Sequence, residues 1–304
     1  MKISVVIPTY NAQEYLPTLL DSLEQQTVEF ELVIIDSTSS DDSVKIARMY
    51  TDMVIVIPKE SFDHGGTRSR AAKMAVGDII VFLTQDALPY NQYSIQNLIN
   101  TFTNSDISAA YGRQLSYDKT NLFGKHLRKF NYTDSSYVRN IKDKNKFGIK
   151  TAFLSDSFSA YRRSALEEIG WFKNGLILGE DTYAGAKLLM AGYNLAYCSE
   201  AKVYHSHSYS IAEEFKRYFD VGVFHASEAW ILDEFGKAEG EGFRYIKSEW
   251  RYLIKHKVFY LIPQFLIRNL CKYIAYKLGQ SYLFMPAYVS QKMSMHSSWW
   301  RTRY

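Results

Sequence analysis

Short apolar runs alternate with amphipathic stretches through the first part of the chain. Each run is followed by a polar break, which is typical of strands buried in a sheet. The predicted strands are residues 3–7, 31–35, 53–57, 79–83 and 107–111. Between them apolar residues recur at helical spacing, and the predicted helices are residues 15–23, 43–49, 67–76 and 90–102. This alternation predicts an α/β fold with a mostly parallel central sheet flanked by helices.

The carboxyl ends of the predicted strands carry the first candidate site residues. In open α/β sheets a ligand binds just beyond these ends. The residues that follow three of the predicted strands are Pro8, Thr9, Tyr10, Asp36, Ser37, Gln85 and Asp86.

The rest of the chain has a different pattern. Residues 118–150 are polar with little period, which predicts a long and partly mobile excursion from the fold. Helices are predicted at 164–169 and 181–191, and strands at 195–197 and 202–204. From residue 211 the pattern is helical, aromatic and basic. We therefore expect an α/β domain over residues 1–210 and a helical C-terminal extension over residues 211–304.

Composition and charge argue against several classes of protein. The 304 residues include 36 Lys and Arg against 32 Asp and Glu, and this slight excess gives no support for nucleic-acid binding. Two cysteines, Cys198 and Cys271, are too few for a disulfide framework and fit a reducing cytoplasm. The longest apolar run, 258–267, is broken by Pro263 and Gln264 and is too short to cross a bilayer. We expect a soluble or peripheral protein.

Asp86 is the first residue that suggests chemistry. It lies in the segment FLTQDA, residues 82–87, where an apolar strand gives way to polar residues, and a carboxylate there can bind a hard divalent cation. The alternative is a turn aspartate before Pro89, because Asp is favoured in turns.

A second group of candidates lies further along the chain. Glu180 and Asp181 begin a predicted helix, and His205 and His207 follow a predicted strand. Carboxylates at a helix start also act as caps, and histidines are often simply packed, so each pair has a purely structural alternative. The combination of Asp86, Asp181 and His205 nevertheless favours a site.

The segment FDHGGTRSR, residues 62–70, places a glycine pair at a predicted helix start. Free backbone amides there, together with the guanidinium of Arg68, suit a diphosphate or a nucleotide edge. The pattern GxGxxG is absent, which disfavours a nicotinamide-dependent oxidoreductase.

These segments together resemble family 2 glycosyltransferases with the GT-A fold, and more closely bacterial rhamnosyltransferases within that family. The resemblance covers roughly the first two thirds of the chain. It rests on motifs in the family's order, namely VVIPTYN, IIDSTSSDDS, DHGGTRSRAAKMAVGDIIVFLTQDA, GED and VYHSH. Residues 1–210 would then be the nucleotide-sugar-binding and catalytic domain.

The resemblance implies a role for each matched position. The general base would be Asp181, the acceptor would contact Glu180 and Trp171, and Mg²⁺ or Mn²⁺ would bind Asp86 and His205. The donor nucleotide sugar would be contacted by Pro8, Thr9, Tyr10, Asp36, Ser37, Arg68, Gln85 and Asp86.

Three positions depart from the family pattern. Thr84 stands where the D-x-D motif has its first carboxylate, so Asp86 alone remains. Ser37 replaces a second Asp that contacts the base in many relatives, and Ser69 replaces an Asn after Arg68.

The expected reaction is inverting glycosyl transfer, because the resemblance supplies one base and no second carboxylate as nucleophile. The resemblance to bacterial rhamnosyltransferases implies dTDP-β-L-rhamnose as the donor and a glycan or lipid-linked glycan as the acceptor. The alternatives are a transferase for another nucleotide sugar, such as a UDP-sugar, and a non-catalytic sugar-nucleotide-binding module. A glycoside hydrolase is disfavoured, because the adjacent Glu180 and Asp181 cannot face each other across a bond.

The last third of the chain mixes cations with aromatic residues. Basic and aromatic side chains on a helix suit a membrane surface, which predicts a location at the cytoplasmic face of the cell membrane. The alternative is that the aromatics pack onto the α/β domain. The cations are Lys247, Arg251, Lys255, Lys257, Arg268, Lys272 and Lys277. The aromatic residues between them are Trp250, Tyr252, Phe259, Tyr260, Phe265, Tyr273 and Tyr276, and the chain ends with Trp299 to Tyr304.

Overall fold

The predicted apolar runs become neighbouring strands of one sheet in the computed structural model, which describes residues 1–301. Within that range nine strands form the sheet, in the order β3-β2-β1-β4-β8-β6-β9-β5, and β7 pairs with β9. The strands are β1 Ile3–Thr9, β2 Glu31–Asp36, β3 Val54–Val56, β4 Ile79–Leu83, β5 Leu88–Pro89, β6 Ile107–Leu115, β7 Tyr137–Arg139, β8 Phe158–Arg162 and β9 Asn194–Tyr204.

The sheet is parallel in its first part and mixed in the rest. Strands β3, β2, β1 and β4 are parallel neighbours, as predicted from the alternating pattern. Strand β8 then runs antiparallel between β4 and β6, and β9 is parallel to β6 but antiparallel to β5 and β7. The α/β fold with flanking helices is confirmed, but the sheet is mixed rather than mostly parallel.

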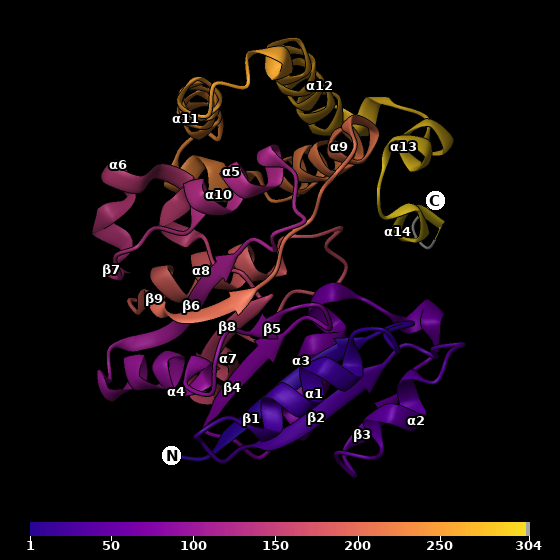
Figure 1. Cartoon of the computed structure of the whole chain (residues 1–304), viewed down its shortest axis with the longest axis vertical. Helices are drawn as coiled ribbons and strands as arrows, with labels where there is room; N and C mark the ends of the chain where they lie inside the picture. The colour runs from indigo at the N-terminus through magenta and orange to yellow at the C-terminus, as the bar shows by residue number, and fades with distance from the viewer. Residues whose placement is uncertain (302–304) are drawn as a thin grey trace.

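Helices cover both faces of the sheet and form a layer beyond it (Figure 1). The α-helices are α1 Leu16–Glu24, α2 Ser43–Ala47, α3 His64–Met74, α4 Ser94–Ile99, α5 Leu122–Asn131, α6 Lys144–Phe147, α7 Arg163–Glu168, α8 Glu180–Met190, α9 Ile211–Ser227, α10 Ala229–Phe235, α11 Glu239–Lys255, α12 Ile262–Gln280, α13 Ala287–Met293 and α14 Ser297–Arg301. Short 3₁₀ helices are η1 Lys59–Ser61, η2 Asn100–Thr103, η3 Ile141–Asp143, η4 Gly148–Ala152, η5 Phe259–Leu261 and η6 Tyr282–Phe284.

Alternate residues of each strand belong to two separate hydrophobic cores. Val5 and Ile7 pack with the apolar side of α1 and with α4, whereas Val6 packs on the other face with α3 and α8. This follows from the two-residue period of a strand, which sends successive side chains to opposite faces. Helix α9 joins the second core through Phe219 and Val223. The C-terminal helices therefore share a core with the sheet.

The segment 118–150 is not the featureless excursion that its pattern predicts. It contains α5, β7, η3, α6 and η4. Helix α5 buries Phe123 in a cluster with Leu253 and Phe265, and His126 Nε2 lies 2.9 Å from Ser248 Oγ. Its order depends on helices more than a hundred residues away in sequence, which a local pattern does not reveal.

The two strands predicted at 195–197 and 202–204 are one continuous strand, β9. Its pairing with β6 shifts register between Gly112 and Arg113, where Cys198 is followed by Lys202 as the next partner. A bulge of this kind explains the polar interruption in the sequence.

The C-terminal helices change the membrane prediction. Arg268 and Lys272 are buried and lie 2.8 and 3.4 Å from the carboxylate of Glu214, so they are not available to a membrane surface. Trp300 is buried, and Trp299 Nε1 donates a hydrogen bond to the carbonyl of Gly175. Trp299 therefore contacts the α/β domain, as the structural alternative expects, whereas the ring of Trp300 packs against Phe219 of α9 and against Tyr282. The predicted contribution of Thr302, Arg303 and Tyr304 lies outside the described residues.

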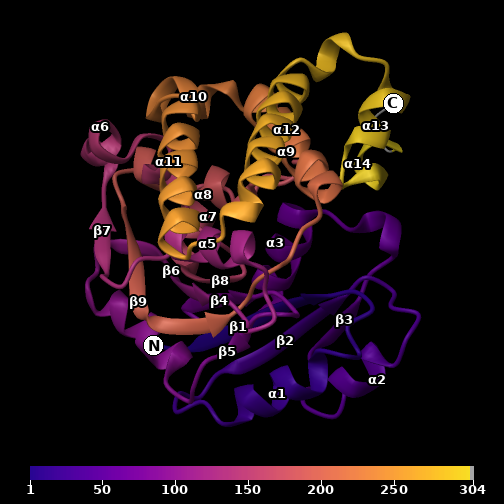
Figure 2. The ribbon, with the colours of Figure 1, turned by 45° about the horizontal axis from the view of Figure 1, so that its top comes forward.

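Helices α9 and α12 pack in direct backbone contact, side by side in Figure 2. A Cβ at Gly279 would lie 2.0 Å from the carbonyl oxygen of Phe219, and one at Gly222 would lie 2.2 Å from that of Tyr276. Among residues 1–301, no helix combines the length and the apolar character needed to cross a lipid bilayer.

Candidate active site

The ends of β1 and β2 are joined by a buried carboxylate. Thr9 and Asp36 are partners in the parallel register, and Thr9 Oγ1 donates a hydrogen bond of 2.8 Å to Asp36 Oδ2. The same carboxylate accepts hydrogen bonds from the amide and the hydroxyl of Ser39. Asp36 is fully buried, so it shapes the turn after β2. Whether it also contacts a nucleoside stays a prediction.

Tyr10 and Gln85 connect the ends of β1 and β4. The Tyr10 amide donates to Gln85 Oε1 at 2.9 Å, and Gln85 Nε2 donates to the Tyr10 carbonyl at 3.3 Å. The exposed Tyr10 ring lies 4.4 Å from the ammonium of Lys59, which also hydrogen bonds to its hydroxyl. Pro8 lies one residue before this end of β1. The buried hydroxyl of Ser37 has no hydrogen-bond partner among the described residues.

Asp86, His205 and His207 form a cluster that can hold a metal ion. One ligand atom from each of the three residues lies within 4.8 Å of the others. Antiparallel pairing explains this arrangement, because Leu88 of β5 faces Tyr204 of β9 and thereby brings the flanking Asp86 and His205 together. His205 Nε2 lies 3.4 Å from Asp86 Oδ1, and His207 Nε2 lies 3.6 Å from Asp86 Oδ2.

Gln114 orients the buried imidazole of this cluster. Its Oε1 accepts a hydrogen bond of 2.7 Å from Arg128 Nη1 and lies 2.8 Å from His205 Nδ1. Since that oxygen is an acceptor, His205 Nδ1 carries the proton and Nε2 presents its lone pair toward Asp86. Metal-ligating histidines are held by partners of this kind.

The ionisation of the cluster also suits a cation. Burial lowers the pKa of both histidines, that of His207 to about 4, so both rings are neutral near pH 7. Burial alone would raise the pKa of Asp86, but its side-chain neighbours His205, Thr84 and His207 hold it below the ordinary value. The site therefore offers one carboxylate and two neutral imidazoles as ligands for a divalent cation.

A second cluster places three carboxylates around one guanidinium. Arg68 Nη1 lies 2.9 Å from Glu180 Oε1, and its Nε lies 3.5 Å from Asp156 Oδ2. Asp156 also accepts hydrogen bonds from the hydroxyls of Ser159 and Tyr161. Arg68 itself is almost completely buried.

Asp181 is the third carboxylate, and among residues 1–301 it forms no ion pair with a cation. Its Oδ1 accepts a hydrogen bond from the Thr182 amide at 2.6 Å, and its Oδ2 lies 3.4 Å from the Asp156 amide nitrogen. Burial, followed by the charges of Glu180 and Asp156, raises its pKa to about 8. Arg68 instead lowers the pKa of Glu180, against the effect of burial. Asp181 is thus the carboxylate of this cluster that most readily takes up a proton at neutral pH.

The start of helix α8 is fixed by a glycine. Gly179 caps the helix with φ +83°, a left-handed conformation that favours glycine. A Cβ at this position would also lie 2.8 Å from the ring of Phe224. Glu180 and Asp181 then occupy the first turn, where the helix dipole favours negative charge.

The glycine pair of the FDHGGTRSR segment is used for packing. The Asp63 carboxylate accepts hydrogen bonds from the amides of Gly66 and Gly175, which caps α3 and ties it to the loop before α8. A Cβ at Gly65 would lie 2.2 Å from the Lys173 carbonyl oxygen. The Gly66 amide, one of those expected to be free for a diphosphate, is therefore already used within the protein. Donor binding by Arg68 stays a prediction, because its guanidinium contacts Glu180.

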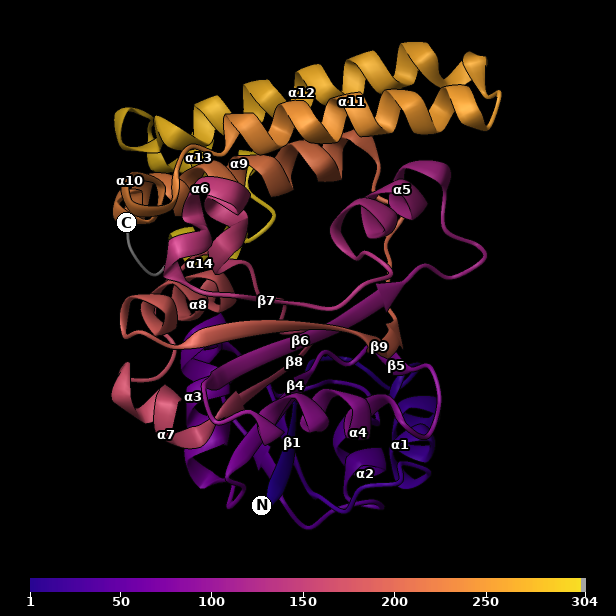
Figure 3. The ribbon, with the colours of Figure 1, turned by 90° about the vertical axis from the view of Figure 1, so that its left-hand side faces the viewer.

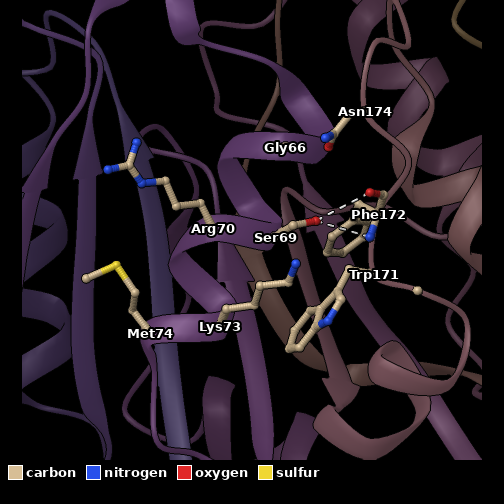
Figure 4. Close-up of a pocket in the computed structure, with 9 residues that line it drawn as sticks. Gly66, Ser69, Arg70, Lys73, Met74, Trp171, Phe172 and Asn174 are labelled. Atoms are coloured by element: carbon tan, nitrogen blue, oxygen red, sulfur yellow. Dashed lines mark hydrogen bonds between the residues drawn. The ribbon is translucent and has the colours of Figure 1, made fainter.

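The structure does not bring Trp171 to the carboxylate cluster. Its ring lies 5.5 Å from the ammonium of Lys73 and 5.9 Å from the guanidinium of Arg163. Together with Arg70, it lines a hollow of about 400 Å³ along α3 (Figure 4). By helical periodicity this is the side of α3 opposite to Arg68.

A chain of contacts joins the two clusters. Gln114, which holds His205, also donates from Nε2 to the hydroxyl of Ser155 at 2.9 Å. The next residue, Asp156, lies beside Arg68 and has its amide nitrogen near Asp181. The predicted metal ligands and the predicted base are therefore connected through Gln114, Ser155 and Asp156. We call this connected set of residues the site wall.

Sequence reasoning missed part of the site wall. His207 was a secondary candidate, although its spacing of two residues from His205 would place both on one side of an extended chain. Gln114 and Asp156 were not predicted, because nothing in their local sequence distinguishes them. Their roles depend on partners that the fold brings from other elements.

Comparisons with known proteins agree with this geometry. The family model described as glycosyl transferase family 2 matches residues 4–170. The chain is 46% identical over 303 residues to the O-antigen chain rhamnosyltransferase RfbN of Salmonella typhimurium, covering 99% of this chain and 96% of that protein. It is 42% identical to the O-antigen chain rhamnosyltransferase WbaN of Salmonella anatum, covering 98% and 95%.

Solved structures show the same fold at low identity. The mannosyltransferase PcManGT of Pyrobaculum calidifontis, in complex with GDP-Man and Mn²⁺, aligns with a TM-score of 0.60 and 15% identity, over 99% of this chain and 86% of that one. TarS 1-349 of S. aureus with UDP-GlcNAc gives 0.57 and 19%, over 97% and 84%. The predicted GT-A type fold is confirmed. With its family model matched over more than half of its length, this chain belongs to glycosyl transferase family 2.

Proposed function

We propose that this glycosyltransferase moves L-rhamnose from dTDP-β-L-rhamnose onto a hydroxyl of a cell-surface glycan, with inversion at the anomeric carbon. The near full-length likeness to two O-antigen chain rhamnosyltransferases supports the sugar. The observation that carries the chemistry is the site wall that joins the Asp86, His205 and His207 cluster to Asp181.

In this mechanism Asp181 accepts the proton of the attacking hydroxyl. A positioned base of this type contributes about 10²- to 10⁴-fold to a rate. Mg²⁺ or Mn²⁺ held by Asp86, His205 and His207 would supply positive charge for the diphosphate leaving group. Of the two ions we propose Mn²⁺, because Mg²⁺ is usually held through carboxylates, phosphates and water rather than through imidazole.

Inversion follows from the partners of the other carboxylates. Glu180 is paired with Arg68, and Asp156 is bound by two hydroxyls and lies near the same guanidinium. Neither is free to act as a nucleophile, which leaves Asp181 as a base in a direct displacement. Glu180 and Trp171 remain proposed acceptor contacts, and Trp171 lacks structural support. Pro8, Thr9, Tyr10, Asp36, Ser37, Arg68 and Gln85 remain the proposed donor contacts.

The acceptor we propose is a glycan carried on a lipid, at the cytoplasmic face of the cell membrane. The likeness to O-antigen enzymes supports the glycan. Residues 1–210 would bind the donor and catalyse transfer, and residues 211–304 would place the enzyme at the membrane.

The function is tested by measuring release of dTDP from dTDP-rhamnose with acceptor glycan and Mn²⁺. We expect Asp181→Asn to abolish transfer while donor binding persists. The acidic limb of kcat/KM against pH should lie near pH 8, because burial raises the pKa of Asp181 to about that value. Equal losses of donor affinity and rate would overturn the role of Asp181 as base.

A panel of nucleotide sugars tests the donor separately. The bound donor raises the melting temperature of the protein. Stabilisation by a UDP-sugar but not by dTDP-rhamnose would overturn the proposed sugar and leave the family unchanged. Stabilisation without any turnover would indicate a binding module.

A further inference from the structure

The outermost helices expose an apolar surface to solvent. Helices α11 and α12 lie in the layer farthest from the sheet (Figure 3). They pack against each other through Trp250 with Phe265 and through Asn269 with Glu249. The outward side chains of α12 are Leu266, Ile267, Leu270, Tyr273 and Ile274, and α11 adds Phe243, Ile246, Trp250 and Ile254. We call these nine residues the hairpin face.

Both ends of α12 extend this surface with exposed rings. Phe259 and Tyr260 precede the helix and are 56% and 77% exposed, and Phe284 follows it at 91%. A contiguous apolar surface of this kind is uncommon on a soluble monomer and marks an interaction site. With apolar side chains at both ends as well as along its length, α12 is suited to lie flat on a surface rather than to enter it end-on.

Cations lie directly beside the hairpin face. Three exposed cations on α11 form a stripe next to its apolar residues, namely Lys247, Arg251 and Lys255. Each of them follows an apolar residue of the hairpin face by one position, and so lies beside it on the helix surface. Arg251 and Lys255 also line a hollow of about 310 Å³ between α11 and α5. No Asp or Glu occurs in the sequence after Glu249, and Glu249 is buried.

We propose that the hairpin face lies in the interface of an anionic lipid bilayer, with the α11 cations against the headgroups. Apolar side chains beside a cationic stripe are the composition that favours this surface. A second copy of the chain fits less well, because a symmetric contact would oppose one cationic stripe to another, and residues 250–301 offer no acidic side chain to pair with them. The purpose of this docking rests on the proposed function, since a lipid-linked acceptor requires a membrane.

Three variants test the proposal on the full chain. The first replaces three hairpin residues, Leu266→Gln, Leu270→Gln and Ile274→Gln. The second replaces the cations, Lys247→Gln, Arg251→Gln and Lys255→Gln. The matched control replaces exposed apolar residues of the α/β domain, Met49→Gln, Val76→Gln and Met190→Gln. All nine positions are solvent-exposed, so folding is expected to survive, and circular dichroism with melting temperature verifies it.

Binding is measured by co-sedimentation with vesicles of phosphatidylethanolamine containing one third phosphatidylglycerol, and with vesicles of phosphatidylcholine alone. We expect the unmodified protein to bind the anionic vesicles and to be released by salt. The apolar and the cationic variants should each bind at least about tenfold more weakly, and the control variant should bind normally. Equal loss in the control, or no loss in either hairpin variant, would overturn the proposal.

Sedimentation velocity tests whether a second copy of the chain, rather than a bilayer, covers the hairpin face. A dimer that dissociates in the Leu266, Leu270 and Ile274 variant, without vesicle binding by the unmodified protein, would assign the hairpin face to a second copy and overturn the lipid proposal. These measurements need no donor, so they are independent of catalysis. Transfer to a soluble glycan by the hairpin variants tests the proposed function separately, and we expect it to persist.

Discussion

At the scale of single residues, the carboxylate cluster around Arg68 has more negative than positive groups. Three carboxylates share one guanidinium, and among residues 1–301 Asp181 is the one that forms no ion pair with a cation. The folded protein therefore binds a proton at Asp181 more tightly than the unfolded chain does, because burial raises its pKa from 3.8 to about 8. The stabilisation that this proton gives is complete at acid pH and is lost as pH rises toward 8.

Replacing Asp181 by Asn should stabilise the protein while it removes activity. The amide has no proton to lose, so the melting temperature of Asp181→Asn should exceed that of the unmodified protein by an amount that grows between about pH 5 and pH 8. Thermal unfolding across this range measures it, with the exposed Asp52→Asn as the control. A difference that does not change with pH would contradict the raised pKa.

Gln114 should control metal affinity without touching the metal. Gln114→Leu removes the acceptor that orients His205, and we expect Mn²⁺ affinity to fall about 10- to 100-fold. Gln114→Glu keeps an acceptor and should restore it. Electron paramagnetic resonance of free Mn²⁺ measures binding without relying on turnover. His207→Ala should weaken binding in the same assay, whereas the exposed Gln92→Leu should not.

Sequence alone could identify the residues at strand ends but not their partners. Asp86 and His205 were predicted as ligands, and the structure brings them together because both flank paired ends of β5 and β9. The pairing of Arg68 with Glu180 was not predicted, since it joins α3 to α8 across more than a hundred residues. For the same reason Asp156 gave no local signal.

At the scale of elements, glycines allow the closest contacts. The amino end of α3 approaches the loop that leads to Glu180 and Asp181, and only the absence of a side chain at Gly65 permits it. The apolar periods of α1, α8 and the central strands were predictable because each element buries one continuous side. Helix α5 was not, because helices far along the chain cover it.

Gly65→Ala should therefore destabilise the fold and disturb the site. The new Cβ would meet the Lys173 carbonyl oxygen at 2.2 Å, and relieving this overlap should lower the free energy of unfolding by about 1–3 kcal/mol. Gly242→Ala is the matched control, since nothing lies within 4 Å of its Cβ and the helix should gain about 0.5–1 kcal/mol. Urea unfolding measures both. Equal effects would contradict the role of close packing.

At the scale of the whole molecule, a buried charge fastens the outer helices to the rest. The single carboxylate of Glu214 on α9 forms ion pairs with both Arg268 and Lys272 on α12. The sequence predicted these two cations at a membrane surface, because the partner that buries them comes from another helix and leaves no local signal. The α/β class and the helical extension were both predictable from pattern.

Glu214→Gln should be among the more damaging single changes in the C-terminal region. It leaves two buried cations without a counter-charge, which costs about 3–5 kcal/mol of unfolding free energy. The exposed pair of Lys144 with Glu234 provides the comparison, and Glu234→Gln should cost less than about 1 kcal/mol. Chemical denaturation distinguishes the two. Similar losses of unfolding free energy in the two variants would mean that the Glu214 ion pairs stabilise the fold no more than a surface ion pair does.

The shared core of α9 and the sheet has a consequence for the choice of acceptor. Because the outer helices are packed on α9, and α9 on the sheet, the hairpin face and Asp181 are held at a set separation. On a bilayer this separation would set the height of Asp181 above the lipid. If the proposed docking holds, a hydroxyl would be selected by its height above the lipid as well as by its chemistry. The enzyme would then modify one step of a growing chain and pass over the same sugar placed nearer to or farther from the membrane.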